Sequence, residues 1–135
     1  MSDVGKSVDQ VSDGLLEYLR LEFDDATIGY DSPLTPLQGG YETSTYSFKL
    51  SGAEQEWSMP LVLRLYPRFY GTGRALWEGT IQNMLADEGY PVSRVHLTCT
   101  DMSVLGGAFF IRNGHISLNY SHVGDVRHEV LADTA

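Results

Sequence analysis

The chain has 135 residues and a mass of 15.0 kDa, a length typical of one domain, so separate catalytic and substrate-binding domains are not expected. Its 18 acidic residues outnumber its 9 Lys and Arg residues, and the net charge of −9 argues against a nucleic-acid or anionic-membrane binder, because such proteins need clustered cations. Hydrophobic residues make up 42% of the chain, which is enough for a folded core.

The first predicted element is an amphipathic helix near the N-terminus. Ser7 and Gln10 fit a capping box, apolar residues then recur at helical spacing, and the helix is expected to end near Phe23. Gly14 weakens this helix by about 1 kcal/mol relative to alanine. Residues 24–36 contain two adjacent acids, a glycine and two prolines, so a connector is expected there.

A strand pattern begins at Leu37. Residues 45–50 alternate polar and apolar side chains, which is typical of a half-buried strand, and two glycines lie shortly before them. A further strand is predicted over residues 61–66, with Pro60 at its start, where the missing N–H is tolerated. The leucines of this strand line one face, and Arg64 points to the other.

A second helix is predicted over residues 74–88, ended by Gly89 as its C-terminal cap. Four apolar residues recur at helical intervals and are expected to face the core: Trp77, Ile81, Met84 and Leu85. Glu78 shares the side of Ile81 and Leu85, so we expect it to face inward at the edge of the helix. Short strands around residues 94–99 and 108–111 complete an order of three strands, a helix and two strands.

Three features together indicate phosphate binding. They are a Gly-rich hairpin at residues 37–46, the strand-borne Arg64 and the inward Glu78. Glycines let the backbone approach a polyphosphate, a cation neutralises the phosphate oxygens, and a carboxylate holds that cation in place. Taken singly, each feature has an ordinary structural interpretation, as a plain hairpin, an edge-strand cation and a solvated helix residue.

In these segments the chain resembles the N-terminal lobe of the aminoglycoside phosphotransferase and choline kinase-like family, which has a protein-kinase-like fold. The matching text is PLQGGYET at 36–43 with Tyr46, LVLRLYP at 61–67, EGTIQ at 78–82, LA at 85–86, GYPVSRV at 89–95 and LGGAFFI at 105–111. The resemblance covers a little over half the chain. The predicted fold class is therefore α+β, a kinase-like N-lobe with a five-stranded antiparallel sheet, one main packed helix and an N-terminal helix.

The resemblance implies ATP and Mg²⁺ as cofactors and suggests roles for single residues. The nucleotide-covering loop would include Gly39, Gly40, Tyr41, Thr43, Ser44 and Thr45. Arg64 would bind phosphate, Glu78 would be its partner, and Phe110 would border the adenine pocket within residues 109–112. Many family members have lysine at the position of Arg64, and arginine keeps the charge but is bulkier and differs in geometry.

The family's catalytic-loop and metal-binding aspartates have no counterpart in this sequence. His122 and Asp125 are only superficially similar to the expected motif, so no catalytic residue is assigned. After Ile111 the similarity stops, and we hypothesise a truncated, frameshifted or mispredicted fragment. The expected division is an N-terminal helix and connector at 1–35, a nucleotide-binding lobe at 36–112 and an unrelated tail at 113–135.

Two functions of different classes follow from this resemblance. The first is the ATP-binding lobe of a small-molecule kinase, which in complete form would transfer the γ-phosphoryl group to a substrate hydroxyl and which is expected to be inactive as this fragment. The alternative is a non-catalytic kinase-like interaction module that associates with itself or another protein through an exposed apolar face of the lobe.

The remaining signals concern location and other chemistry. The lone Cys99 and a start without a secretory signal favour a cytoplasmic setting, and no apolar run approaches the length of a membrane span. His115, His122 and His128 match no common zinc spacing, and Cys99 is interpreted as a strand-core residue. A short strand at residues 116–120 and a helical turn at 126–131 are expected in the tail.

Overall fold

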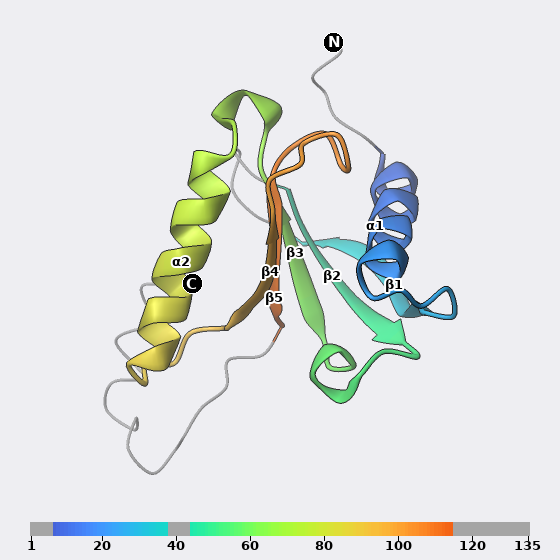
Figure 1. Ribbon diagram of the computed structural model, residues 1–135, viewed down its shortest axis with the longest axis horizontal. Coiled ribbons are helices and arrows are strands. Elements are labelled where there is room, and N and C mark those ends of the chain that lie inside the picture. The colour runs from blue at the N-terminus through green and yellow to red at the C-terminus, as the bar shows by residue number, and fades with distance from the viewer. Residues whose placement is uncertain (1–6, 38–43, 115–135) are drawn as a thin grey trace.

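A computed structural model describes residues 7–37 and 44–114 of the chain as two helices and a five-stranded sheet (Figure 1). The elements are α1 (Val8–Glu22), β1 (Gly29–Leu37), β2 (Ser44–Ser51), β3 (Leu61–Leu65), α2 (Gly73–Asp87), β4 (Val95–Cys99) and β5 (Phe109–Asn113). Neither helix in these ranges is long and apolar enough to cross a bilayer. The predicted tail elements and the three tail histidines lie outside the described residues.

The sheet has the strand order β1-β2-β3-β5-β4, and every neighbouring pair is antiparallel. The two helices lie on opposite sides of it, α1 over one face and α2 over the other (Figure 1). This arrangement confirms the predicted α+β class, with a five-stranded antiparallel sheet and two helices.

Helix α1 begins as the sequence predicts. The N–H of Gln10 donates to Ser7 Oγ at 3.2 Å, and the N–H of Ser7 donates to Gln10 Oε1 at 2.9 Å, which forms the capping box. Three buried residues at helical spacing pack toward the sheet: Val11, Leu15 and Leu19. Gly14 has a packing reason, because a Cβ there would lie 3.1 Å from Leu105 Cδ2. The helix therefore tolerates this glycine in exchange for a close approach to the 101–107 loop.

The predicted connector at residues 24–36 is wrong, because most of it forms the edge strand β1. An edge strand pairs on one side only, so Pro33 and Pro36 can lie where no N–H is needed. The pairing of β1 with β2 also shifts register twice, between Tyr30 and Thr35. These irregularities remove the regular alternation that would have marked a strand in the sequence, and the strand ends at Leu37 instead of beginning there.

The predicted apolar inner face of α2 is also wrong. Trp77 is 67% exposed and Met84 is 57% exposed, whereas the buried residues of this helix are Ala75 and Gly79. A Cβ at Gly79 would lie 3.1 Å from Thr98 Oγ1, so the small residues let the helix backbone approach the sheet closely. The helix bounds and the Gly89 cap agree with the prediction, since Gly89 adopts a φ of 93° after the helix ends.

Polar side chains complete the contact between α2 and the sheet. Asn83 Nδ2 donates to the carbonyl of Val95 at 3.0 Å, and the Val95 N–H donates back to Asn83 Oδ1 at 2.7 Å. Gln82 Nε2 donates to the carbonyl of Ser93 at 2.7 Å. These bonds satisfy backbone groups around the start of the edge strand β4.

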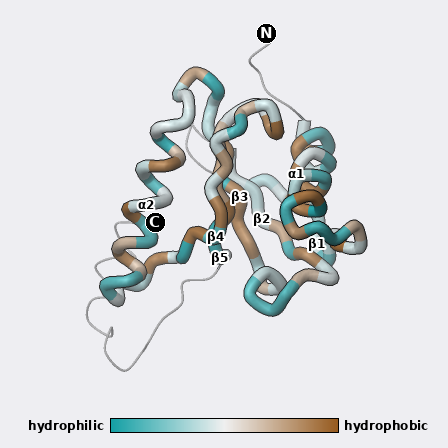
Figure 2. Tube along the Cα trace, in the orientation of Figure 1, coloured by the Kyte–Doolittle hydropathy of each residue, from teal (hydrophilic) through white to brown (hydrophobic). Residues whose placement is uncertain are grey.

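The apolar core is divided between the two faces of the sheet. The α1 face holds the larger cluster, in which Leu61, Leu63, Phe109 and Ile111 are fully buried. The α2 face holds a smaller cluster of Tyr66, Ala75, Val95, Ala108 and Phe110. In Figure 2 the central strands β3 and β5 are the most continuously hydrophobic segments of the sheet. Because α2 covers β4 and β5, the polar residues of β2 and β3 on this face lie beside the helix and not beneath it.

Candidate functional site

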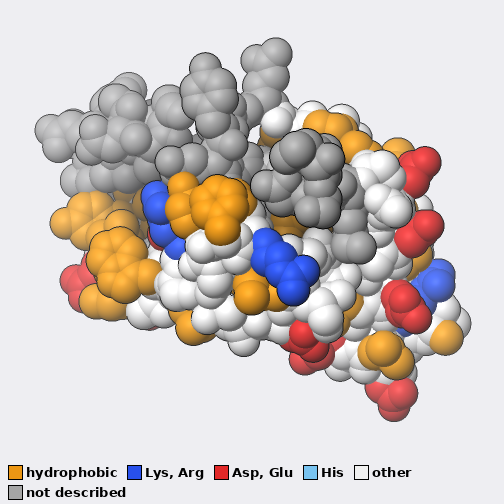
Figure 3. All heavy atoms as spheres, turned by 90° about the horizontal axis from the view of Figure 1, so that it is seen from above, with side chains coloured by type: hydrophobic (Ala, Val, Ile, Leu, Met, Phe, Trp, Pro, Cys, Tyr) orange, Lys and Arg blue, Asp and Glu red, His pale blue; other side chains and the backbone are white. Residues whose placement is uncertain are grey.

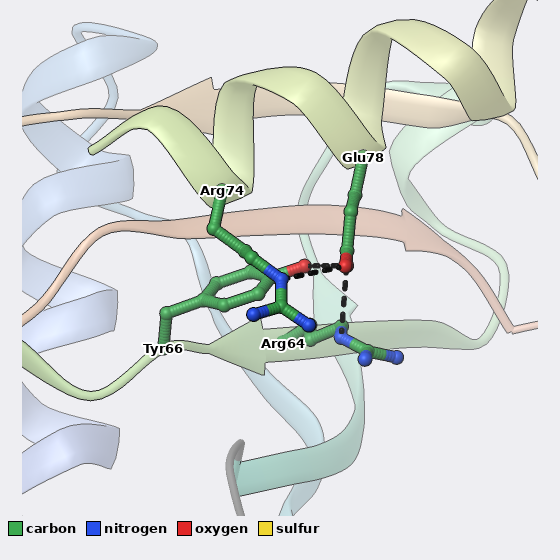
Figure 4. Close-up of polar contacts among 4 residues, drawn as sticks. All are labelled: Arg64, Tyr66, Arg74 and Glu78. Atoms are coloured by element: carbon green, nitrogen blue, oxygen red, sulfur yellow. Dashed lines mark hydrogen bonds and ion pairs between the residues drawn. The ribbon is translucent and has the colours of Figure 1, made fainter. Parts of the chain in front are cut away.

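Arg64 and Glu78 meet between β3 and α2, although they are far apart in the sequence (Figure 4). Alternation along β3 directs Arg64 away from the buried Leu61 and Leu63, toward the face that α2 covers. Its Nε lies 3.7 Å from Glu78 Oε1, within ion-pair distance but too far for a hydrogen bond. That Nε atom is buried and has no hydrogen-bond partner among the described residues.

Two further residues hold Glu78 in place. The hydroxyl of Tyr66 donates a hydrogen bond to Glu78 Oε1, and Arg74 Nε donates to Oε2 at 3.2 Å (Figure 4). Both carboxylate oxygens therefore have donors before any ligand is present. Sequence reasoning missed these two residues, although Tyr66 is two positions from Arg64 on the same strand face and Arg74 is four positions before Glu78 on the helix.

The site carries more positive than negative charge. Arg64 and Arg74 face the single carboxylate of Glu78, and Arg64 Cζ also lies 5.6 Å from the centroid of the Tyr66 ring. Burial, and then donation to the Glu78 carboxylate, raise the pKa of Tyr66 above its ordinary value, and the charge of Arg64 opposes this shift. Tyr66 therefore remains a neutral hydrogen-bond donor at physiological pH.

The guanidinium of Arg64 is oriented by this arrangement. In Figure 4 its Nε faces Glu78, and its two terminal nitrogens point away from the carboxylate. The side chain is 38% exposed, so these terminal donors are accessible to a ligand. A planar fork of N–H donors is suited to the oxygens of a phosphate or carboxylate group.

The structure places other predicted site residues around Arg64. Thr45 is its register partner on β2, and Phe110 is its partner on β5, so both lie on the same face. Thr45 is half-buried, but Phe110 is only 2% exposed and packs in the cluster beneath α2. Ser44 is paired with Leu65 and belongs to the opposite face.

The other four loop residues predicted to bind nucleotide lie outside the described residues. They are Gly39, Gly40, Tyr41 and Thr43. Their assignment stays a prediction.

Within residues 7–37 and 44–114, no group of three or more His, Cys, Asp or Glu side chains is placed to hold a metal ion. Glu78 is already paired with Arg64 and Arg74. These residues therefore fit the binding of an anion and do not themselves fit Mg²⁺.

Surface charge is distributed unevenly around the site. Viewed from above, Figure 3 shows hydrophobic side chains with Lys and Arg among them on the α2 side, and most acidic side chains on the α1 and β1 side. The sequence agrees, since residues 1–31 hold eight acids and two bases. The candidate site, where two arginines meet one carboxylate, therefore belongs to the less acidic part of this acidic protein.

Comparison with solved structures finds a likeness to the crystal structure of a "putative aminoglycoside phosphotransferase" from Ralstonia eutropha JMP134. The match has 25% sequence identity and a TM-score of 0.50, and it covers 75% of this chain and 26% of that one. No protein-family model and no curated protein matches the chain. The chain therefore corresponds to about a quarter of the Ralstonia protein, and the likeness supports a relation to phosphotransferases at the level of family and fold.

Proposed function

We propose that this chain is the ATP-binding N-lobe of a small-molecule phosphotransferase, with a protein-kinase-like fold. The observation that carries the proposal is the Arg64–Glu78 pair, which joins a central strand to α2 and turns the terminal nitrogens of Arg64 away from the carboxylate. The likeness to the Ralstonia protein supports the same class of chemistry. In complete form the protein would transfer the γ-phosphoryl group of ATP to a substrate hydroxyl.

The residues of this chain would contribute charge and positioning. Arg64 would donate to phosphate oxygens through its terminal nitrogens, while Glu78 fixes the guanidinium from the Nε side. Tyr66 and Arg74 would keep Glu78 from rotating away, because each donates to a different carboxylate oxygen. Phosphoryl transfer depends mainly on such positioning and charge neutralisation.

The nucleotide-binding part of the proposal is residues 36–112. Helix α1 and most of β1 add to its stability, because Val11 and Leu34 are buried in the same cluster as Leu63. Mg²⁺ bound to the nucleotide would neutralise phosphate charge, and its protein ligands would have to come from outside the described residues. The proposal therefore assigns nucleotide binding to this chain and assigns no catalytic residue.

Calorimetric titration of the whole chain with MgATP tests the proposal. We expect saturable binding that Arg64→Ala weakens by about 10- to 100-fold, since a hydrogen bond to a charged group contributes about 1.5–3 kcal/mol. Glu78→Ala should also weaken binding, because it releases the guanidinium. Lys49→Ala is the matched control: this cation lies on β2, pairs with Asp31 at 3.9 Å and has a similar side-chain exposure.

Two results would contradict the proposal. Wild-type protein that shows no saturable MgATP binding has no nucleotide site of this kind. Equal loss of affinity in Lys49→Ala and Arg64→Ala would mean that binding follows general surface charge and not the ion pair.

A second candidate function is that of a non-catalytic interaction module, the alternative anticipated from the sequence, which associates with itself or another protein. The specific observation is a group of large apolar side chains exposed on or next to α2: Phe69, Leu76, Trp77, Met84 and Tyr90. Apolar exposure of this kind marks interaction surfaces in soluble proteins. The occupant we favour is a second copy of the chain, because a symmetric dimer covers both surfaces at once.

Sedimentation velocity over a range of protein concentrations tests this candidate. A concentration-dependent dimer that Trp77→Glu converts to monomer supports it. Monomeric wild-type protein at all concentrations rules it out, and MgATP binding can be present or absent in either case.

A further inference from the structure

Arg112 is a cation in the sheet, and no carboxylate of the described residues pairs with it. It lies on β5, is half-buried, and uses Nη1 to donate to Ser93 Oγ at 3.3 Å and to the carbonyl of Asn113 at 3.1 Å. Within residues 7–37 and 44–114 no Asp or Glu lies within ion-pair distance of its guanidinium. By contrast, the neighbouring Arg94 is paired with Asp87.

Arg112 shares a sheet face with Arg64. Arg64 is the register partner of Phe110, and Arg112 is the partner of Val62, so the two arginines are diagonal neighbours on adjacent antiparallel strands. Diagonal neighbours of this kind are about 7–8 Å apart at the backbone, which long side chains can span. Burial, and then the charge of Arg64, lower the pKa of Arg112 below its ordinary value.

The charges on this face do not balance. Arg64 and Arg74 meet the carboxylate of Glu78, and Arg112 adds a further positive charge near Arg64, in a protein whose net charge is −9. Partly buried like charges are unfavourable unless an opposite charge compensates them. The polar residues Thr45 and Ser47 extend the same face on β2, so the surface beside the arginines is suited to a hydrated anion.

We infer that Arg64 and Arg112 form a two-arginine site that holds the phosphate chain of a polyphosphate ligand. Arg64 lies at the Glu78 end, and Arg112 lies two residues beyond Phe110, the β5 partner of Arg64. Arg112 would then bind phosphate and not border adenine, as the resemblance implied. The inference rests on the proposed nucleotide-binding function for the identity of the ligand and extends it to a second binding residue. Both acceptors of Arg112, Ser93 Oγ and the Asn113 carbonyl, are neutral, and a neutral donor could serve them. An anionic ligand gives a reason for the positive charge at this position.

Calorimetry with inorganic tripolyphosphate, followed by MgATP, tests the inference on the whole chain. Arg64→Gln and Arg112→Gln should each weaken tripolyphosphate binding by about 10-fold or more, since each removes charge-assisted hydrogen bonds. Arg112→Lys should lose less, because it keeps the charge. Arg94→Gln is the matched control and should change the affinity by no more than about twofold, since Arg94 is already paired at the surface.

The outcomes separate this inference from the proposed function. If Arg64→Gln weakens MgATP and tripolyphosphate binding while Arg112→Gln leaves both within about twofold, the two-arginine site is wrong and the nucleotide proposal stands. If tripolyphosphate binds through both arginines but MgATP does not bind, the site stands and the nucleotide proposal is wrong. If neither ligand binds wild-type protein, both are wrong.

A second measurement covers the case in which Arg112→Gln does not fold. Phenylglyoxal modifies arginines, and peptide mapping of the wild-type protein reports the labelling of each one. Protection of both Arg64 and Arg112 by tripolyphosphate, with Arg94 labelled equally in its presence and absence, supports the inference. Protection of Arg64 without protection of Arg112 overturns it.

Discussion

Gly107 lies directly against the backbone of Tyr66, and replacing it with alanine should destabilise the protein strongly. A Cβ at this position would lie 2.1 Å from the carbonyl oxygen of Tyr66 and 3.6 Å from the N–H nitrogen of Arg68. Real Cβ contacts are almost never shorter than 3.0 Å, so the two segments would have to move apart by about 0.9 Å. The neighbour that must move is backbone, which cannot rotate away as a side chain can.

The magnitude follows from what that movement breaks. Overpacking of a well-packed site costs about 1–3 kcal/mol. The same displacement strains the hydrogen bond from the Tyr66 N–H to the carbonyl of Ala108, 2.9 Å long and worth about 1 kcal/mol net. We therefore expect Gly107→Ala to lower the free energy of unfolding by about 2–4 kcal/mol and to shift the position of the Tyr66 hydroxyl against Glu78.

Urea unfolding followed by Trp fluorescence measures this effect. With a slope of about 2 kcal/mol per molar urea, the middle of the usual range, the midpoint should fall by about 1–2 M. Gly73→Ala is the matched control, because nothing lies within 4 Å of its Cβ position and alanine favours the first turn of α2. A Gly107→Ala midpoint within about 0.3 M of wild type would show that the β3–β5 junction is looser than the described contacts require.

Three further predictions concern the helices and the site. Ser7→Ala removes the N-cap of α1 and should cost about 1 kcal/mol, measured by urea unfolding; no change would contradict the capping box. Trp77→Ala should change stability by about 0.5 kcal/mol or less, whereas Ala75→Leu should cost about 1–3 kcal/mol, and the reverse order would mean that α2 packs through its apolar face. Folding raises the pKa of Tyr66, so the stability that its neutral hydroxyl contributes is fully present below the unfolded pKa of about 10. That stability is lost as the pH rises from about 10 through the higher pKa of the folded protein. Tyr66→Phe should therefore be about 1 kcal/mol less stable near neutral pH but lose less stability above pH of about 10, and parallel pH profiles would contradict this.

The elements with regular local patterns could be predicted from the sequence. The capping box of Ser7 and Gln10, the alternation along β3 and the Gly89 cap all depend on residues close together in the chain, so they were predicted correctly. Two predictions made from the local sequence pattern were wrong. Strand β1 was hidden by Pro33 and Pro36, and the face of α2 was assigned to Trp77 when Ala75 is buried instead.

The sequence by itself determined the class of fold, the strand-borne cation and the inward glutamate, because alternation in a strand and the helical period place Arg64 and Glu78 on known faces. Only the tertiary structure decided how far apart they are and what else joins them. Tyr66, Arg74 and Arg112 are brought to the site by the docking of α2 and by the pairing of β3 with β5. That docking depends on the small side chains of Ala75 and Gly79, since close approach between distant segments leaves no apolar periodicity in the chain.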